Sequence, residues 1–338
     1  MKIAFYLSDM GGSLLMVGLS RGLERLGHTP EQYRPGGGYD LVLIFNQSVH
    51  THHYAYPPFP NGGCPIVFID NAEYGYFKRL PGVRDDYLNT FSPGAMNHDT
   101  KNKFQQQRLK DYLDGKSFPY FLREYFKDHD WPESYHPIDY PLYAFSTCEK
   151  RPSLDEYVAR QNDLFVFWGG SHPWRHNITA ALRECPVNSD INLIDDITNP
   201  RRPQREYFLK TEAAKASVSF DGYGASSFRL TEVLVRTVLL RGPLTIKLRD
   251  DLTDGVNCVE YGVESDGETF LSTDVNEKLL GALADPEAAY RIYEAGYRHC
   301  MEYWTEEATA RYLLEKVMAH DYSKPTPLDL QGICHNLA

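Results

Sequence analysis

A glycine-rich turn between a predicted strand and a predicted helix holds the residues best suited to chemistry. The turn contains Gly222, Gly224 and Ser226, and a helical pattern of apolar residues follows it. The open backbone N–H groups of such a turn, with the positive end of a helix dipole, favour an anion. Arg229 and Glu232 are three residues apart, which places both on one face of that helix.

Arg229 and Glu232 together indicate a nucleotide site. A guanidinium binds a diphosphate through charge-assisted hydrogen bonds, and a carboxylate accepts hydrogen bonds from the vicinal hydroxyls of a ribose. The alternative is an exposed ion pair, which stabilises a helix by only about 0.2–0.5 kcal/mol. Because the pair directly follows a glycine–serine turn, we predict that it binds a nucleoside diphosphate.

A second glycine pair follows an earlier predicted strand, residues 164–168. Gly169, Gly170 and Ser171 form the turn, and Arg175 follows closely. Backbone N–H groups and a cation at this point would neutralise a diphosphate leaving group, on which negative charge develops. The alternative is a plain strand-to-helix turn. We predict that these four residues bind the donor.

Asp70 is the predicted catalytic base. It ends the apolar run 64–69, and the carboxyl ends of parallel strands face the ligand crevice in α/β folds. A carboxylate there could deprotonate an acceptor hydroxyl as it attacks an anomeric carbon. The alternative is an Asp that caps a turn, and Glu73 is a second candidate base. Gly12, in a glycine pair after the first predicted strand, is a weaker candidate for donor contact.

The composition is that of a globular protein. A chain of 338 residues suggests two domains, and 42% apolar with 24% charged residues is ordinary for such a fold. The net charge of −11 argues against indiscriminate binding to nucleic acids. Six scattered cysteines without a CxxC pair indicate reduced thiols. The chain has no membrane-length apolar run and begins with a strand rather than a signal peptide, so we expect a cytoplasmic protein.

Strands and helices alternate in two series, which predicts an α/β fold with two Rossmann-like domains facing a cleft. Predicted strands are residues 2–8, 40–45, 64–69, 164–168, 191–194, 217–220, 244–248 and 258–261. Predicted helices include residues 14–26, 118–127, 205–216, 232–240, 276–284, 286–305 and 306–318. We expect an acceptor domain over 1–145, a nucleotide-sugar domain over 146–315, and a helix end and tail over 316–338 that would pack back on the first domain.

This order of elements resembles the GT-B class of glycosyltransferases, including the bacterial CgeB-like group. The similar features are the Gly-Gly-Ser turn, the Arg-x-x-Glu helix, DGVNCVEY at 254–261 and LADPEAAYRIYEAGYRHC at 283–300. The DNA β-glucosyltransferases of T-even phages are also similar: they begin Met-Lys-Ile-Ala and have a Gly-Gly-Ser loop, an Arg-x-x-Glu pair and a strand-ending aspartate. Their basic residues after the loop fall at other spacings. The resemblance covers the second half well and the first half in outline.

The resemblance implies a glycosyltransferase that takes a nucleotide sugar, UDP-linked, as co-substrate and holds no tightly bound cofactor. The acceptor stays open between a saccharide, a small molecule and modified DNA. Three alternatives also stay open: a phage-type enzyme acting on hydroxymethylated DNA bases, a nucleotide-sugar epimerase, and a non-catalytic binder. We expect no metal at the histidines of residues 50–53 or at Asp128-His-Asp130, because ligand spacing is lacking or the context is wrong.

Overall fold

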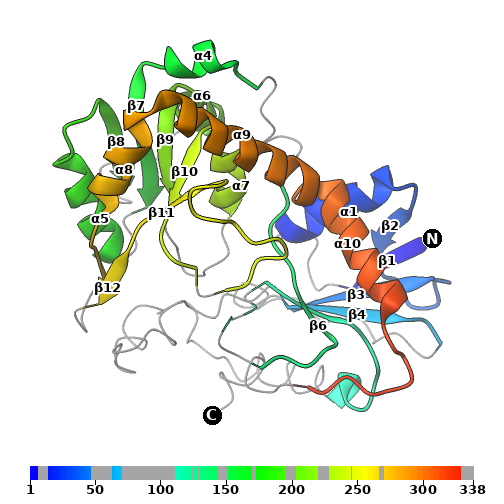
Figure 1. Ribbon diagram of the computed structural model, residues 1–338. Coiled ribbons are helices and arrows are strands. Elements are labelled where there is room, and N and C mark those ends of the chain that lie inside the picture. The colour runs from blue at the N-terminus through cyan, green and yellow to red at the C-terminus, as the bar shows by residue number, and fades with distance from the viewer. Residues whose placement is uncertain are drawn as a thin grey trace.

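Two parallel β-sheets, each covered by helices, make up the computed structural model (Figure 1). The structure describes residues 1–6, 14–46, 63–70, 111–123, 125, 127, 130–143, 151–169, 173–194, 203–219, 228–244, 246–265 and 270–328. The first six strands of the chain form the first sheet, and the next five form the second sheet. The predicted fold class, α/β with two Rossmann-like units, is confirmed, and the cleft between the units stays a prediction.

The first sheet has six strands in the order β2-β1-β3-β4-β5-β6, and every neighbouring pair is parallel. The strands are β1 (Lys2–Tyr6), β2 (Thr29–Gln32), β3 (Leu41–Asn46), β4 (Ile66–Asp70), β5 (Tyr120–Leu122) and β6 (Tyr135–Pro137). The central strands are apolar along their length because both faces of the sheet are covered. The spatial order reverses between β1 and β3, which makes that pair a topological switch point.

Two helices that are far apart in the sequence cover one face of the first sheet. Helices α1 (Leu14–Arg25) and α10 (Glu306–Ala319) lie side by side (Figure 1). Leu19 of α1 and Leu313 of α10 belong to the same buried cluster as the strand residues beneath them. The boundary expected at residue 315 therefore falls inside a helix. We propose that the first unit includes the whole of α10.

Glycines in α1 permit this close approach. A Cβ atom on Gly22 would lie 2.0 Å from the carbonyl oxygen of Glu306, and one on Gly18 would lie 2.4 Å from Cγ of Pro141. Glu306 is fully buried, and its Oε2 lies 3.0 Å from Nη2 of Arg25. Helix α1 thus packs closely against the start of α10 and against the segment around Pro141, where the chain leaves the first unit.

Residues after α10 continue along the first unit. The backbone N–H of Phe118 donates to Oγ1 of Thr326 at 2.8 Å, and the hydroxyl of Tyr135 donates to the carbonyl oxygen of Pro327 at 2.7 Å. This segment therefore closes the apolar cluster on the opposite face of the sheet, where Leu328 packs.

The second sheet has five parallel strands in the order β11-β10-β9-β7-β8. They are β7 (Asn162–Gly169), β8 (Ser189–Ile194), β9 (Ala214–Ser219), β10 (Val238–Arg241) and β11 (Val259–Glu260), and β12 (Val263–Ser265) with β13 (Phe270–Ser272) forms a separate antiparallel hairpin. The chain builds β7 first, places β8 on one side of it and the later strands on the other. The switch point of this sheet therefore lies between β7 and β9.

Helices cover both faces of the second sheet. They are α4 (Leu154–Val158), α5 (Pro173–Arg183), α6 (Gln204–Glu212), α7 (Phe228–Leu234), α8 (Val275–Ala284) and α9 (Pro286–Tyr303). Alternate residues of β7 point to opposite faces. Trp168 joins the core under α5, α8 and α9, whereas Phe165 and Phe167 pack with Tyr207 of α6.

Three predicted elements are wrong. The helix expected over 118–127 contains β5, because Tyr120-Phe121-Leu122 is fully buried and pairs with β4. The helix expected over 232–240 ends at Leu234, and the chain then enters β10. Residues 244 and 246–248, the described part of the strand expected over 244–248, belong to no strand of the sheet, where β10 takes that place. Strand β2, which is short and half-exposed, lacks the apolar pattern that would predict it.

A buried acid joins the two units where the chain crosses between them. Oδ2 of Asp139, after β6, accepts the backbone N–H of Arg249 at 2.8 Å. Burial raises the pKa of Asp139 to about 6, against a lowering by the nearby Arg249, and Asp250 and Asp251 raise it further. The folded protein therefore holds a proton at Asp139 more tightly than the unfolded chain does.

We expect this acid to make stability depend on pH. The pKa of Asp139 is raised from 3.8 to about 6, so the free energy of unfolding falls as pH rises through that window, by about 3 kcal/mol in all. Asp139→Asn should remove that slope, which urea unfolding at pH 4, 5, 6 and 7 would measure. Parallel pH profiles for the wild type and the variant would contradict this assignment.

Candidate functional site

The switch point between β7 and β9 is the centre of the candidate site. β7 ends at Gly169 and β9 at Ser219, and both carboxyl ends lead into the glycine turns singled out in the sequence. In open α/β sheets, ligands bind outside the strand ends at such a point. Gly170, Ser171, Gly222, Gly224 and Ser226 lie outside the described residues, so their roles stay predictions.

Arg229 reaches across the switch point. It is the second residue of α7, which follows β9, and its Nη1 donates to the carbonyl oxygen of Phe167 in β7. Its Cζ lies 5.5 Å from the centre of the Tyr207 ring. The guanidinium is therefore held beside the end of β7 by a strand on one side and by α6 on the other.

Glu232 lies one turn after Arg229 and is almost completely buried. Its residue is 4% exposed, so the alternative of an exposed surface ion pair is wrong. The carbonyl oxygen of Glu232 accepts a hydrogen bond from Nη1 of Arg236 at 2.9 Å. A hydrogen bond to a carboxylate is stronger in such a low-dielectric setting than in water. The structure thus places a carboxylate and a cation on one helix at the switch point.

Arg175 lies on the other side of the end of β7. It is in the first turn of α5, and its Cζ is 5.9 Å from the ring centre of Trp168. Nε1 of Trp168 donates to Oγ1 of Thr179 at 2.9 Å, which fixes α5 to the strand. The structure therefore brings Arg175 and Arg229 to the last residues of the same strand, from two different helices.

Asp70 is the last residue of β4 in the first sheet. Its Cα is in register with Asn46 at the end of β3 and with Leu122 at the end of β5. This places the backbone of Asp70 at the carboxyl edge, one strand from the switch point between β1 and β3. Gly12 and Glu73 lie outside the described residues, and the side chain of Asp70 is not described, so their contacts stay predictions.

Tyr207 and Arg236 are neighbours of the candidate site that sequence reasoning missed. Arg236 is buried, and its Nε lies 3.2 Å from Oε1 of Glu212 at the end of α6. Tyr207 lies beside Arg229, so the two interactions join α6 to the start of α7 and to the residues just after it. An aromatic pair, Tyr207-Phe208, in a helix before the glycine turn is the only signal for them, and it does not identify their partners.

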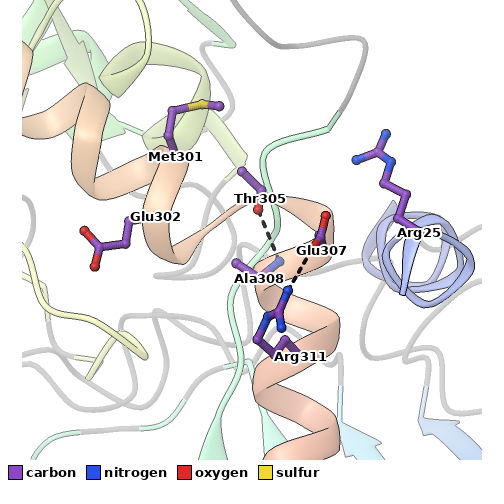
Figure 2. A pocket seen from close by; sticks show the side chains of 7 residues that line it. All are labelled: Arg25, Met301, Glu302, Thr305, Glu307, Ala308 and Arg311. Carbon is purple, nitrogen blue, oxygen red and sulfur yellow. Dashed lines mark hydrogen bonds and ion pairs between the residues drawn. The ribbon is translucent and has the colours of Figure 1, made fainter. Parts of the chain in front are cut away.

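A surface pocket lies elsewhere, where α1, α9 and α10 meet (Figure 2). Its lining residues are Arg25, Met301, Glu302, Thr305, Glu307, Ala308 and Arg311. Arg311 is paired with Glu307 at 2.7 Å, and the hydroxyl of Thr305 accepts the N–H of Ala308 at 3.1 Å (Figure 2). These contacts stabilise the first turns of α10, and no predicted site residue lines the pocket.

Two further findings concern metals and membranes. Among the residues that the structure describes, no group of His, Cys, Asp and Glu is arranged to hold a metal ion. Cys64, Cys185, Cys258 and Cys300 are free thiols. Within the same described part of the chain, no helix has the length and apolar character needed to cross a membrane.

Solved structures similar to this chain include glycosyltransferases. The Anabaena protein HepE in complex with UDP and glucose is 12% identical, over 94% of this chain and 100% of that one, with a TM-score of 0.49. Sucrose-phosphate synthase of Thermosynechococcus elongatus is 11% identical, over 94% and 99%, with a TM-score of 0.48. An alpha-glucosyltransferase in complex with UDP-glucose and DNA containing an abasic site is 9% identical, over 94% and 99%, with a TM-score of 0.49. No family model and no curated protein matches the chain. At these identities and TM-scores we assign no substrate or activity from the matches.

Proposed function

We propose that this protein is a glycosyltransferase that binds a nucleotide sugar at the β7/β9 switch point and transfers the sugar to an acceptor hydroxyl. The observation that supports this best is the position of Arg229. It extends from the helix after β9 to the Phe167 carbonyl of β7, with the buried Glu232 on the same helix. The choice of UDP as the nucleotide rests on the sequence resemblance.

The proposed roles follow from charge. When the bond between the anomeric carbon and the diphosphate breaks, negative charge grows on the departing oxygen. Arg229 and Arg175 would stabilise that charge, helped by the backbone N–H groups of the turn after β7. The Glu232 carboxylate would accept hydrogen bonds from the ribose. Asp70, on the first unit, would remove the proton of the acceptor hydroxyl, and closure of the two units would exclude competing water.

The donor site can be tested by ligand binding. UDP at about 100 times its dissociation constant should add about 2.7 kcal/mol to the free energy of unfolding, seen as a raised melting temperature. Arg229→Ala should weaken UDP binding by about 30-fold and uridine binding far less, because a charge-assisted hydrogen bond contributes about 1.5–3 kcal/mol. Glu232→Gln should weaken both ligands alike, since both contain the ribose. Isothermal titration calorimetry would measure both affinities.

A matched control is Arg183→Ala, which removes an exposed arginine from the far end of α5. It should leave both affinities at the wild-type level. Wild-type UDP affinity in the Arg229 and Glu232 variants would refute the proposed site.

Product analysis separates the remaining alternatives. With a UDP-sugar and no acceptor, an epimerase would yield a changed sugar still linked to UDP, whereas a glycosyltransferase would release UDP by slow hydrolysis. A binder would do neither. Faster UDP release with added saccharides or with hydroxymethylated DNA would then identify the class of acceptor.

A further inference from the structure

Helix α6 presents two neighbouring aromatic rings to two arginines, one in the first turn of α7 and one just after the end of α7. The ring of Tyr207 lies 5.5 Å from Cζ of Arg229, and the ring of Phe208 lies 3.8 Å from Cζ of Arg236. Both distances fall in the range of cation–π attraction, about 6 Å or less. Helix α6 therefore makes two contacts of the same chemical kind, one with α7 and one with the residues just after it.

The ring of Tyr207 is buried between α6 and the face of the second sheet. The residue is 7% exposed, and its ring centre is 6.0 Å from those of both Phe165 and Phe167. Arg229 donates to the carbonyl oxygen of that same Phe167. The guanidinium is thus fixed between an aromatic ring and a strand carbonyl, and the ring itself cannot move without disturbing β7.

The phenol of Tyr207 also lies close to both predicted donor residues. Burial raises the pKa of Tyr207, Arg229 lowers it, and Glu232 raises it. The pKa of the Tyr207 hydroxyl is raised above an already high value, so the side chain stays neutral at physiological pH. Its ring then presents an electron-rich face to Arg229. Tyr207 therefore interacts with the predicted donor residues through electrostatics as well as through packing.

We propose that Tyr207 is a positioning residue for the donor diphosphate: its ring holds Arg229 at the β7/β9 switch point before the ligand arrives. This inference rests on the proposed function. A free arginine side chain has several rotatable bonds, and ordering it on binding lowers affinity. A ring that orders it in advance removes that cost, so Tyr207 should affect ligands that contain the diphosphate and not the nucleoside alone.

Phe208 provides a matched comparison on the same helix. The arginine it faces, Arg236, is ion-paired with Glu212 at 3.2 Å and donates to the carbonyl oxygen of Glu232 at 2.9 Å. Arg236 therefore stabilises the C-terminal end of α7 against α6, which is a structural role. Loss of the Phe208 ring should lower stability without a selective effect on diphosphate binding.

The test compares the affinities for UDP and uridine, measured by isothermal titration calorimetry. Tyr207→Met, which keeps apolar bulk but removes the ring, should weaken UDP binding by about tenfold and uridine binding by less than about twofold. Tyr207→Phe, which keeps the ring, should restore UDP affinity to within about threefold of the wild type. Phe208→Met should lower the melting temperature and leave the ratio of the two affinities unchanged. In an Arg229→Ala background, Tyr207→Met should have no further effect on that ratio.

Equal loss of UDP and uridine affinity in Tyr207→Met, or no loss of either, would overturn the inference. If that variant does not fold, phenylalanines with increasing ring fluorination at position 207 replace it: UDP affinity should fall with each fluorine, and a flat series would overturn the inference. Wild-type UDP affinity in Arg229→Ala would instead refute the proposed function, so the two failures are distinguishable.

Discussion

Replacing Asp70 by asparagine is expected to lower the rate of sugar transfer by about 10²–10⁴-fold, the range that a general base contributes. The amide cannot take a proton from the acceptor hydroxyl, while the proposed donor site on the other unit is untouched. UDP affinity should therefore stay near the wild-type value. The rate of UDP release with saturating acceptor, beside calorimetric titration with UDP, would measure both quantities.

The place of Asp70 in the first sheet suits the role of a base. It ends β4, in register with Asn46 at the end of β3, so its backbone stands at the carboxyl edge beside a switch point. Asp40 is a matched control at the opposite edge, where its Oδ2 accepts the N–H of Lys2 at 2.7 Å. Asp40→Asn should transfer sugar at the wild-type rate. Full activity in Asp70→Asn would show that Asp70 is not the base and would leave Glu73 as the candidate base.

Gly22→Ala is expected to destabilise the fold by about 3 kcal/mol, at the upper end of what overpacking costs. The new Cβ atom would lie 2.0 Å from the carbonyl oxygen and 2.6 Å from the carbonyl carbon of Glu306, and 2.8 Å from Cβ of Ala310. Two of these are backbone atoms, which cannot rotate away as a long side chain can. Helices α1 and α10 must therefore move apart, and the loss should appear as a lower midpoint of urea unfolding.

Gly281→Ala adds the same methyl group to a helix where space is free. Gly281 lies in α8, is exposed, and its Cβ would meet nothing within 4 Å. Since alanine is the better helix former by about 0.8–1.0 kcal/mol, this control should stabilise the protein slightly. Equal unfolding midpoints for Gly22→Ala and the wild type would show that α1 and α10 are not packed as described.

The candidate donor site could be proposed from sequence because its signals are local. A strand, a glycine turn and a helix follow each other without interruption, so Arg229 and Glu232 can be placed on one helix face from spacing alone. The partners of Arg229 could not be found in this way. Phe167 and Tyr207 come from other elements, and only the pairing of β7 with β9 brings them to the same point.

Errors in the predicted elements arose where buried residues follow one another without a helical or strand period. Residues 231–242 are all buried, so the pattern gives no sign that a helix ends at Leu234 and a strand begins at Val238. The aromatic run that contains β5 is equally ambiguous, because a short buried strand and a buried helical turn share the same composition. Strand pairing settles both cases, and pairing is a long-range property.

The return of α10 to the first unit has a consequence for how the protein is made. The apolar face that α1 and the first sheet present is completed by Leu313, Leu314 and Val317, which the ribosome delivers only after the whole second unit. At translation rates of about 5–20 residues per second, the first unit waits for roughly 10–40 s with that face open. The second unit is complete before α10 is synthesised. Although its sequence comes first, the first unit is therefore the last part of the molecule to mature, and chaperones that shield apolar surfaces on nascent chains have that interval in which to act.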